Sequence, residues 1–424
     1  MTKRILIITY YWPPTGGSGV QRWVKFAKYL PQMGWQPVVY TPENPEQLAV
    51  DESLLKEIPS SVEVLKTRIV EPYNIYRKIF GGKTEVNPVN SKKSGWKKRL
   101  TGWIRGNLFI PDPRISWVRP SVKYLKDYLK LHPVDVIVTT GPPHSMHLIG
   151  RKLHADTGIR WIADFRDPWT EMFYFKHLYL TECSEKKHRS LEQSVLDEAD
   201  AIISVSPRVQ DDFRRHTATE VHLITNGYDA SDFPDTEPVP RGDFFTVVHT
   251  GLFASDGNPL FLWDELARKC ARNPEFKEKL RICLAGKTDT EIFDAILDRG
   301  MGDNLENPGY LSHSETVFRQ RSASILILPL RQEPEYSKVL PGKIFEYLAA
   351  RRPVLGIGQE KGAAAEILRE CKAGDMFEWD NRDGIRHFIE TEWEKFLSGK
   401  QEVLDSDIEQ YERRNLTKKL TEIL

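Results

Sequence analysis

Short apolar runs alternate with amphipathic helical patterns along almost the whole chain. The apolar runs are mostly continuous rather than interrupted by polar residues, which is typical of parallel strands covered on both faces. Between two of them, Val20, Trp23, Val24, Ala27 and Leu30 follow the spacing of one helical face. The alternation predicts an α/β protein whose parallel sheets are joined by right-handed helical crossovers.

The predicted strands fall into two series, which indicate two sheets. The first series covers residues 5–9, 37–41, 62–65, 134–140, 160–165, 201–205 and 221–225. The second series covers residues 245–250, 280–285, 324–328, 353–357 and 376–379. The segment 71–120 interrupts the first series, because it contains no clear strand pattern.

A proline-rich, acidic stretch separates the two series. Residues 229–243 contain Pro234, Pro238, Pro240 and Gly242 and few apolar side chains, as expected for an interdomain linker. We therefore expect one α/β domain over 1–235, with an insertion at about 71–120, and a second over 243–400. The pattern of residues 405–424 predicts a final helix.

Composition excludes several classes of protein. Of the 424 residues, 40% are hydrophobic and 28% are charged, as in a globular protein. Sixty Lys and Arg balance sixty Asp and Glu, so we expect no nucleic-acid partner bound by a global charge. No apolar run reaches the ~20 residues of a membrane span. The four scattered cysteines predict free thiols, and the sole Asp-x-Asp, at 405–407, predicts a helix cap, so no metal or cofactor is expected.

A basic segment stands out in this neutral chain. Between 89 and 111 there are aromatic and aliphatic residues and no acidic one, and Trp96 and Trp103 lie on a common helical face. The basic residues are Lys92, Lys93, Lys97, Lys98, Arg99 and Arg105. Such a pattern predicts a helix on an anionic membrane, through 92–109. The alternative is a surface insertion whose apolar side packs on its own domain.

Two loops in the first half could contact a ligand. The first contains Gly16, Gly17 and Gly19 between a strand and a helix, where glycines allow close backbone approach and free N–H groups can face an anion. Its spacing does not match a dinucleotide fingerprint, and it could be a simple tight turn. The second contains His144, which follows another strand and could exchange a proton or be structural.

Charged residues also follow the strand at 160–165. Asp164, Arg166 and Asp167 stand beside Trp169 in a loop where buried charge is costly unless it is paired or used. The alternative to a catalytic role is an Asp–Arg ion pair that fixes the loop.

A cationic helix start lies in the second half. Pro341 suits a first helical turn, and Gly342 and Lys343 with the open N–H groups there could hold a diphosphate. Glu346, one turn later, could accept hydrogen bonds from two ribose hydroxyls or be an ordinary solvated residue.

Taken in order, these segments resemble a family-4-type (group 1) glycosyltransferase with the GT-B fold. The similarity covers almost the full length. It is carried by the glycine-rich first loop, 164–169, 205–206, 226–229, Gly251, 285–286, 309–313 and, most specifically, 341–347. The resemblance implies two Rossmann-like domains facing across a cleft, with segment 405–424 returning to the first. It also implies a nucleotide-sugar in the second domain and an acceptor in the first.

The resemblance carries over unevenly to single residues. Glu346 matches the second of the family's paired glutamates, but the position of the first is Lys338. The Arg and Lys that often follow the glycine matched by Gly251 are absent, so Lys287, Lys338 or Lys343 would hold the diphosphate. Many members also have a histidine near the position of Arg166, where this chain has Arg166 followed by Asp167.

The resemblance implies a retaining glycosyltransferase of cell-surface glycan synthesis. It would move a sugar from a nucleotide-diphosphate-sugar to a polysaccharide or lipid-linked glycan acceptor. Asp167 is the first candidate for orienting or deprotonating the acceptor hydroxyl, followed by His144, with Arg166 beside them. The enzyme would be cytoplasmic, with peripheral attachment to the inner membrane face. The alternatives are a non-catalytic glycan-binding or assembly subunit and a nucleotide-sugar epimerase of the same fold.

Overall fold

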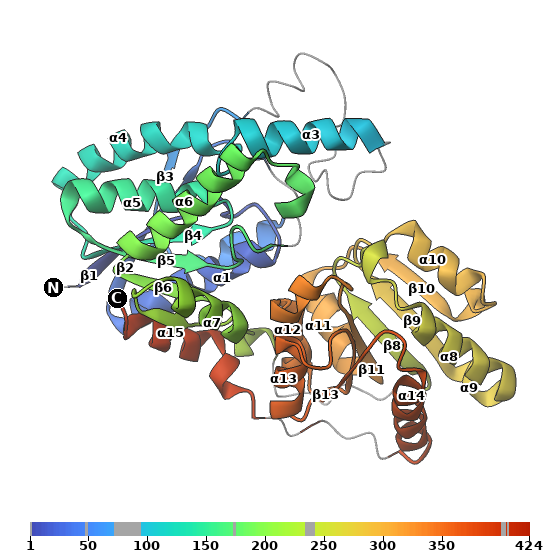
Figure 1. Ribbon diagram of the computed structural model, residues 1–424. Coiled ribbons are helices and arrows are strands. Elements are labelled where there is room, and N and C mark those ends of the chain that lie inside the picture. The colour runs from blue at the N-terminus through green and yellow to red at the C-terminus, as the bar shows by residue number, and fades with distance from the viewer. Residues whose placement is uncertain are drawn as a thin grey trace. The chain divides into compact units, whose positions relative to one another are not determined.

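The computed structural model of the chain forms two compact units, each built around one parallel sheet (Figure 1). It describes residues 2–46, 50–71, 95–172, 175–233, 242–399, 404 and 407–424. Unit 1 contains residues 1–225 and 414–424, and unit 2 contains residues 226–413. The division falls just before the proline-rich stretch, whose three prolines lie outside the described residues.

Unit 1 has a seven-stranded sheet with the order β3-β2-β1-β4-β5-β6-β7. All its neighbouring strands are parallel. The strands are β1 Lys3–Ile8, β2 Trp35–Pro42, β3 Glu63–Thr67, β4 Val136–Gly141, β5 Arg160–Phe165, β6 Ala201–Ser204 and β7 Val221–Leu223. Each predicted strand of the first series is therefore present, within three residues at either end.

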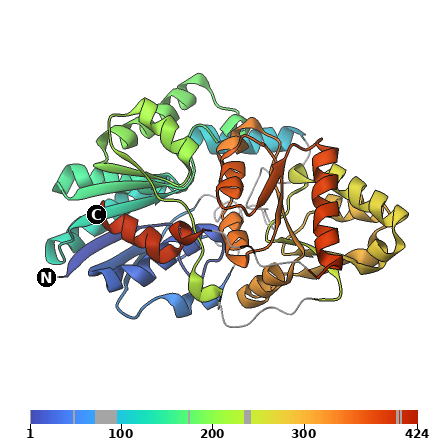
Figure 2. The same cartoon turned by 90° about the horizontal axis from the view of Figure 1, so that it is seen from below.

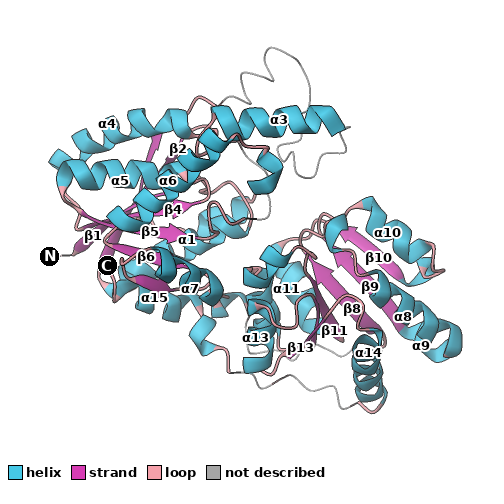
Figure 3. Cartoon of the chain, in the orientation of Figure 1, coloured by secondary structure: helices cyan, strands magenta, loops and turns pink. Residues whose placement is uncertain are grey.

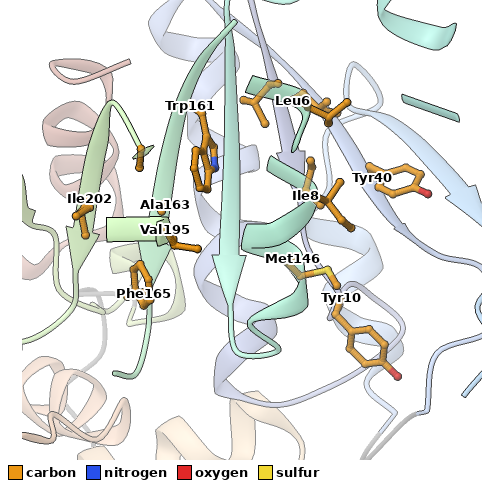
Figure 4. Close-up of a cluster of buried hydrophobic side chains, with 14 of the residues drawn as sticks. Leu6, Ile8, Tyr10, Tyr40, Met146, Trp161, Ala163, Phe165, Val195 and Ile202 are labelled. Atoms are coloured by element: carbon orange, nitrogen blue, oxygen red, sulfur yellow. The ribbon is translucent and has the colours of Figure 1, made fainter. Parts of the chain in front are cut away.

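Helices cover both faces of this sheet (Figures 1 and 3), as continuous apolar strands require. Leu6 and Ile8 of β1 belong to one apolar cluster, part of which is drawn in Figure 4, and Ile5 and Ile7 belong to the other. The helices are α1 Ser18–Tyr29, α3 Gly95–Leu108, α4 Ile115–Leu131, α5 Ser145–Thr157, α6 Glu182–Glu198, α7 Pro207–His216 and α15 Arg413–Thr421, with 3-10 turns η1 Leu30–Met33, η2 Glu52–Glu57 and η4 Phe175–Leu178.

Unit 2 has a six-stranded parallel sheet with the order β10-β9-β8-β11-β12-β13. The strands are β8 Phe245–Thr250, β9 Leu280–Ala285, β10 Leu305–Gly309, β11 Ile325–Pro329, β12 Val354–Ile357 and β13 Gly374–Phe377. The sequence pattern missed β10. This strand lies at the sheet edge with no buried residue, so it needs no apolar run.

The helices of unit 2 also form two layers, one on each face of the sheet (Figure 1). The longer helices are α8 Leu260–Arg272, α9 Pro274–Lys279, α10 Thr290–Leu297, α11 His313–Ser322, α12 Lys343–Ala350, α13 Ala363–Glu370 and α14 Arg382–Leu397. The 3-10 turns are η5 Ala230–Asp232, η6 Ser255–Gly257, η7 Gly302–Asn304, η8 Pro334–Lys338 and η9 Glu409–Tyr411.

The predicted final helix over 405–424 is too long. Helix α15 begins at Arg413, and Ile408 and Tyr411 before it pack in a core of unit 2. Leu416 and Leu420 pack in unit 1 with residues of α1, and Figure 2 shows this last helix along that unit. The returning segment is therefore 414–424, and the predicted cap at 405–407 lies before the helix and partly outside the described residues.

The insertion contains α3 and the start of α4, and residues 72–94 lie outside the described part. Two glycines allow α3 to approach η4 closely. A Cβ on Gly102 would lie 2.6 Å from the carbonyl oxygen of His177, and one on Gly106 would lie 2.7 Å from the Cβ of Leu178. Across the described residues, no helix combines the length and hydropathy needed to cross a membrane.

Candidate functional site

The charged groups predicted from sequence lie where open α/β sheets place ligands, at the carboxyl ends of the strands. In unit 1, Asp164 is near the end of β5, and Arg166 and Asp167 follow it. His144 precedes the first residue of α5, just after β4. Arg166, Asp167 and His144 therefore follow the ends of adjacent strands, because β4 and β5 are neighbours.

The buried ion pair of this region joins Asp164 to Arg22 of α1. The Nη2 atom of Arg22 lies 2.8 Å from Oδ1 of Asp164, and both side chains are fully buried. Trp23 and Thr140 donate further hydrogen bonds to the same carboxylate at 2.7 and 2.9 Å. Burial alone would raise the pKa of Asp164, but Arg22 and the other donors hold the pKa below its usual value.

Arg166 is a structural crosslink rather than the partner of Asp167. Its guanidinium donates to the carbonyl oxygens of Gly19 at 2.9 Å, Gly141 at 3.3 Å and Pro142. A Cβ at Gly19 would lie only 2.2 Å from its Nη1 atom. The third glycine of the first loop is therefore needed for this crosslink, and the predicted Asp–Arg pair of residues 166 and 167 is not formed.

The rest of the first loop turns the chain into α1. Gly17 has φ +110° and precedes the first residue of α1, and its carbonyl accepts from Val20 at 3.0 Å. Gly16 lies in the same turn. A positive φ favours glycine at position 17, so the simple-turn interpretation accounts for that residue.

Asp167 has no hydrogen-bond or ion-pair partner within the described part of the chain. Burial raises its pKa to about 6, although Arg166 opposes the shift. A carboxylate that ionises near neutrality and has no partner can accept a proton from a hydroxyl. The geometry therefore leaves Asp167, not Asp164, available for chemistry.

His144 is almost fully buried, and its ring stacks on Trp169 with centroids 4.8 Å apart. Neither ring nitrogen has a hydrogen-bond partner. Burial and the neighbouring His147 hold the pKa of His144 well below its ordinary value, so the ring is neutral. His144 therefore has one free donor and one free acceptor.

In unit 2, Lys343 is the first residue of α12, and its side chain lies half-buried beside β8. Its Nζ lies 2.8 Å from Nε2 of His249 and donates to the carbonyl oxygen of Leu252 at 3.2 Å. Among the described residues, no carboxylate forms an ion pair with it. Desolvation lowers the pKa of Lys343 to about 8, with Glu346 opposing. Lys343 is thus a half-buried amine that forms no ion pair within the described part of the chain.

Glu346 is held one turn further along α12. Its Oε2 accepts from Nε2 of Gln320 at 3.1 Å, and the same amide donates to Thr250 Oγ1 at 3.0 Å. Gln320 is fully buried, so it fixes the carboxylate relative to the end of β8.

Three glycines with positive φ bring the loops after β8, β9 and β10 close together. Gly251 donates to Ala285 O at 2.8 Å, and Gly286 donates to Gly309 O at 2.7 Å. A Cβ on Gly286 would lie 2.5 Å from Gly251 O, whereas one on Gly251 would have Lys343 Nζ at 3.9 Å as its nearest neighbour. The backbone at Gly251 therefore leaves room beside the lysine amine.

The other predicted donor residues lie at the same ends of strands or just before α12. Lys287 is exposed after β9, Lys338 ends η8, and Gly342 precedes the first residue of α12. Sequence reasoning missed His249 and Gln320, because nothing in their local pattern marks them. Within the described residues of either unit alone, no three His, Cys, Asp or Glu side chains converge as metal ligands.

The comparisons with known proteins agree with this layout. The model of Glycosyltransferase Family 4 matches residues 17–232, which is just over half of the chain. The sequence search found no matching curated protein.

Solved structures share the fold at low identity. Sucrose-phosphate synthase from Thermosynechococcus elongatus is 14% identical with a TM-score of 0.61, and 99% of this chain aligns with 98% of that one. WaaG, a glycosyltransferase involved in lipopolysaccharide biosynthesis, is 12% identical with a TM-score of 0.57 over 99% of each chain. Anabaena HepE in complex with UDP-glucose is 15% identical, with a TM-score of 0.59 over 99% and 98% of the two chains. The family match and the two Rossmann-like sheets together show that the chain is a glycosyltransferase of Glycosyltransferase Family 4 with the GT-B fold.

Proposed function

We propose that this glycosyltransferase moves a sugar from a nucleotide-diphosphate donor to a hydroxyl of a polysaccharide or lipid-linked glycan, with retention at the anomeric carbon. The observation that carries the donor class is Lys343, a half-buried amine with no ion-pair partner among the described residues. Partial removal of a cation from water is costly unless an anion joins it. The crystal structure of HepE with UDP-glucose supports a nucleotide-sugar as the source of that anion.

The diphosphate would lie at the start of α12. Lys343 and the open N–H groups there provide positive charge, and Gly251 leaves room for the phosphates. As the glycosidic bond breaks, negative charge grows on the leaving diphosphate, and fixed positive groups lower the barrier. Glu346 would accept hydrogen bonds from ribose hydroxyls, with Gln320 fixing its orientation.

The acceptor would bind to unit 1, with Asp167 orienting or deprotonating its hydroxyl. Its pKa of about 6 leaves it mostly ionised at pH 7, which a general base requires. Arg166 would hold the glycine loop and the β4 loop in place, because its donors are used on their carbonyl oxygens.

Nucleotide binding tests the donor site directly. A thermal-shift panel of UDP, GDP, ADP, CMP and their sugars should identify one nucleotide that stabilises the protein, by ~2.7 kcal/mol at 100 times its dissociation constant. Proton NMR of the product would then separate transfer with retention from donor hydrolysis or epimer formation. If no nucleotide stabilises the protein, the donor assignment is wrong.

We further propose that α3 holds the enzyme on an anionic membrane surface. Gly102 and Gly106 face η4 and the two residues after it, so this side of α3 packs on the unit. Large apolar side chains of the helix remain exposed, namely Leu100, Trp103, Ile104 and Leu108. This orientation disfavours the alternative in which the apolar side packs on its own domain. Basic residues without local acidic ones favour an anionic lipid surface over a neutral partner.

A further inference from the structure

A pocket in unit 1 lies beneath α3 and beside the ends of β4 and β5. It is lined by Arg105 of α3, His144, Trp169 and Phe175, and its volume is about 100 Å³. This is several times the volume that one water molecule needs. The walls combine aromatic rings with polar side chains, which is typical of sites that bind small ligands.

Two polar groups in the pocket are not used by the protein. His144 is only 5% exposed, and neither ring nitrogen has a hydrogen-bond partner. Buried polar atoms of this kind are rare, because a buried donor or acceptor without a partner destabilises the folded protein. The guanidinium of Arg105 also has no hydrogen-bond or ion-pair partner among the residues that the structure describes.

Two other polar side chains of the pocket, His188 and Asp112, already form hydrogen bonds within the protein. Nε2 of His188 contacts the carbonyl oxygen of Gly106 at 3.1 Å, and Nδ1 accepts from the indole of Trp169 at 3.1 Å. Asp112 accepts from the backbone N–H and the hydroxyl of Ser145 at 2.8 and 2.9 Å. His188 and Asp112 therefore have little capacity left for a ligand.

The charge of the remaining cation, Arg114, is already matched. Its Nε lies 3.0 Å from Glu71 and its Nη2 lies 3.3 Å from Glu46, and both carboxylates are buried. Arg105 is thus the arginine of the pocket that forms no ion pair among the described residues, and Asp112 is a carboxylate in the same lining.

We infer that this pocket binds a sugar unit of the acceptor, with a phosphate on that sugar contacting Arg105. A neutral imidazole has one donor and one acceptor, which suits a sugar hydroxyl because a hydroxyl both donates and accepts. A guanidinium suits a phosphate, to which it can donate two parallel hydrogen bonds. This inference rests on the proposed transferase function and specifies its acceptor as a sugar phosphate, either soluble or linked to a lipid.

Binding of small probes to the full chain tests the pocket. The probes are glucose 1-phosphate and N-acetylglucosamine 1-phosphate, with the two free sugars, inorganic phosphate and farnesyl phosphate, observed by saturation-transfer NMR. We expect a sugar 1-phosphate to bind more tightly than either free sugar or inorganic phosphate. If farnesyl phosphate also competes for the site, the phosphate source is a lipid-linked acceptor. If it does not compete, the source is a soluble sugar phosphate.

Three variants assign the binding to the pocket. Arg105→Gln should weaken sugar 1-phosphates about tenfold and leave free sugars unchanged, and Arg105→Lys should restore part of the loss. His144→Phe, which preserves a ring against Trp169, should weaken both free and phosphorylated sugars. Arg119→Gln is the matched control, because Arg119 is an exposed arginine of the neighbouring helix α4 and does not line the pocket.

The inference is overturned if no sugar 1-phosphate binds the wild-type protein at millimolar concentration. It is also overturned if Arg105→Gln and His144→Phe, shown by circular dichroism to be folded, bind the probes like Arg119→Gln. Nucleotide binding to the same samples separates this failure from that of the proposed function, because the donor residues all belong to unit 2.

Discussion

Arg22 in unit 1 and Lys343 in unit 2 are both cations near the carboxyl ends of a parallel sheet, the first fully buried and the second half-buried, but they differ in their partners. Arg22 forms an ion pair with Asp164 at 2.8 Å and donates to the carbonyl oxygens of Ile224 and Thr225. Lys343 contacts an imidazole and a carbonyl oxygen instead. Where the chain supplies the anion, the cation stabilises the fold. Where it does not, the cation is available for an anionic ligand.

The same contrast separates two carboxylates three residues apart. Asp164 is surrounded by donors that lower its pKa, whereas desolvation without a hydrogen-bond partner raises the pKa of the half-buried Asp167 to about 6. The carboxylate near the end of β5 is therefore structural, and the one in the loop after it is the candidate base.

The largest effect expected from this comparison is on stability. Asp164→Asn leaves Arg22 as a buried cation without its anion, so we expect a loss of about 3–5 kcal/mol in the free energy of unfolding. Urea unfolding followed by near-UV circular dichroism measures it. Asp167→Asn is the matched control and should unfold like wild type. Equal stability of the two variants would contradict the division into structural and available carboxylates.

The transfer rate should depend on the carboxylate that contributes little to stability. Asp167→Asn should lower the transfer rate at least ~100-fold and leave nucleotide affinity unchanged, because a general base contributes about that much. Steady-state transfer and nucleotide titration, both with the nucleotide found in the thermal-shift panel, measure the two quantities. Unchanged turnover would exclude Asp167 as the base.

In unit 2, two substitutions should affect different ends of the bound nucleotide. Lys343→Met removes a charge at the diphosphate, so it should weaken pyrophosphate binding by about 1.5–3 kcal/mol and leave the nucleoside unaffected. Glu346→Gln should weaken the nucleoside and not pyrophosphate. Calorimetric titration of both ligands gives the comparison, and identical losses for the two ligands would mean that the site is misplaced.

The pH dependence should separate the two units, because Lys343 should limit donor affinity at alkaline pH and Asp167 should limit transfer at acid pH. Lys343 binds the diphosphate as an ammonium, so affinity should be constant below pH 8 and fall about tenfold per pH unit above it. Asp167 acts as a carboxylate, so transfer should fall as the pH drops below about 6. Binding of the nucleotide-sugar, whose diphosphate diester has no protonation step near neutral pH, should show only the alkaline limb, and an acid limb there would assign the lower pKa to unit 2.

The smallest effect concerns α3, where each cation near an anionic surface contributes up to ~1 kcal/mol. Wild type should pellet with anionic but not zwitterionic vesicles and should be released near ~1 M salt. The combined change of Lys92, Lys93, Lys97, Lys98 and Arg99 to Gln should keep the protein in the supernatant. The same change at the exposed Arg272 and Lys277 of unit 2 is the control. Equal pelleting of the α3 variant would exclude the membrane proposal.

The sequence by itself determined the two sheets and where the candidate residues stand along the chain. Continuous apolar runs must be buried on both faces, so they specify parallel strands whatever the rest of the chain does. Charged and glycine residues directly after such runs are then placed at the carboxyl ends of the strands, as Asp167 and Gly251 are. Strand β10 was not predicted from the apolar runs, because an exposed edge strand needs no apolar residues.

Only the tertiary structure decided which of these residues are satisfied. The partner of Asp164 is Arg22, 142 residues earlier. No local sequence pattern indicates that Asp164 pairs with Arg22 rather than with Arg166. His249 reaches Lys343 from 94 residues away. Hydrogen bonding and burial depend on groups that folding brings together from distant positions, so sequence can nominate charged residues but cannot tell the paired from the available.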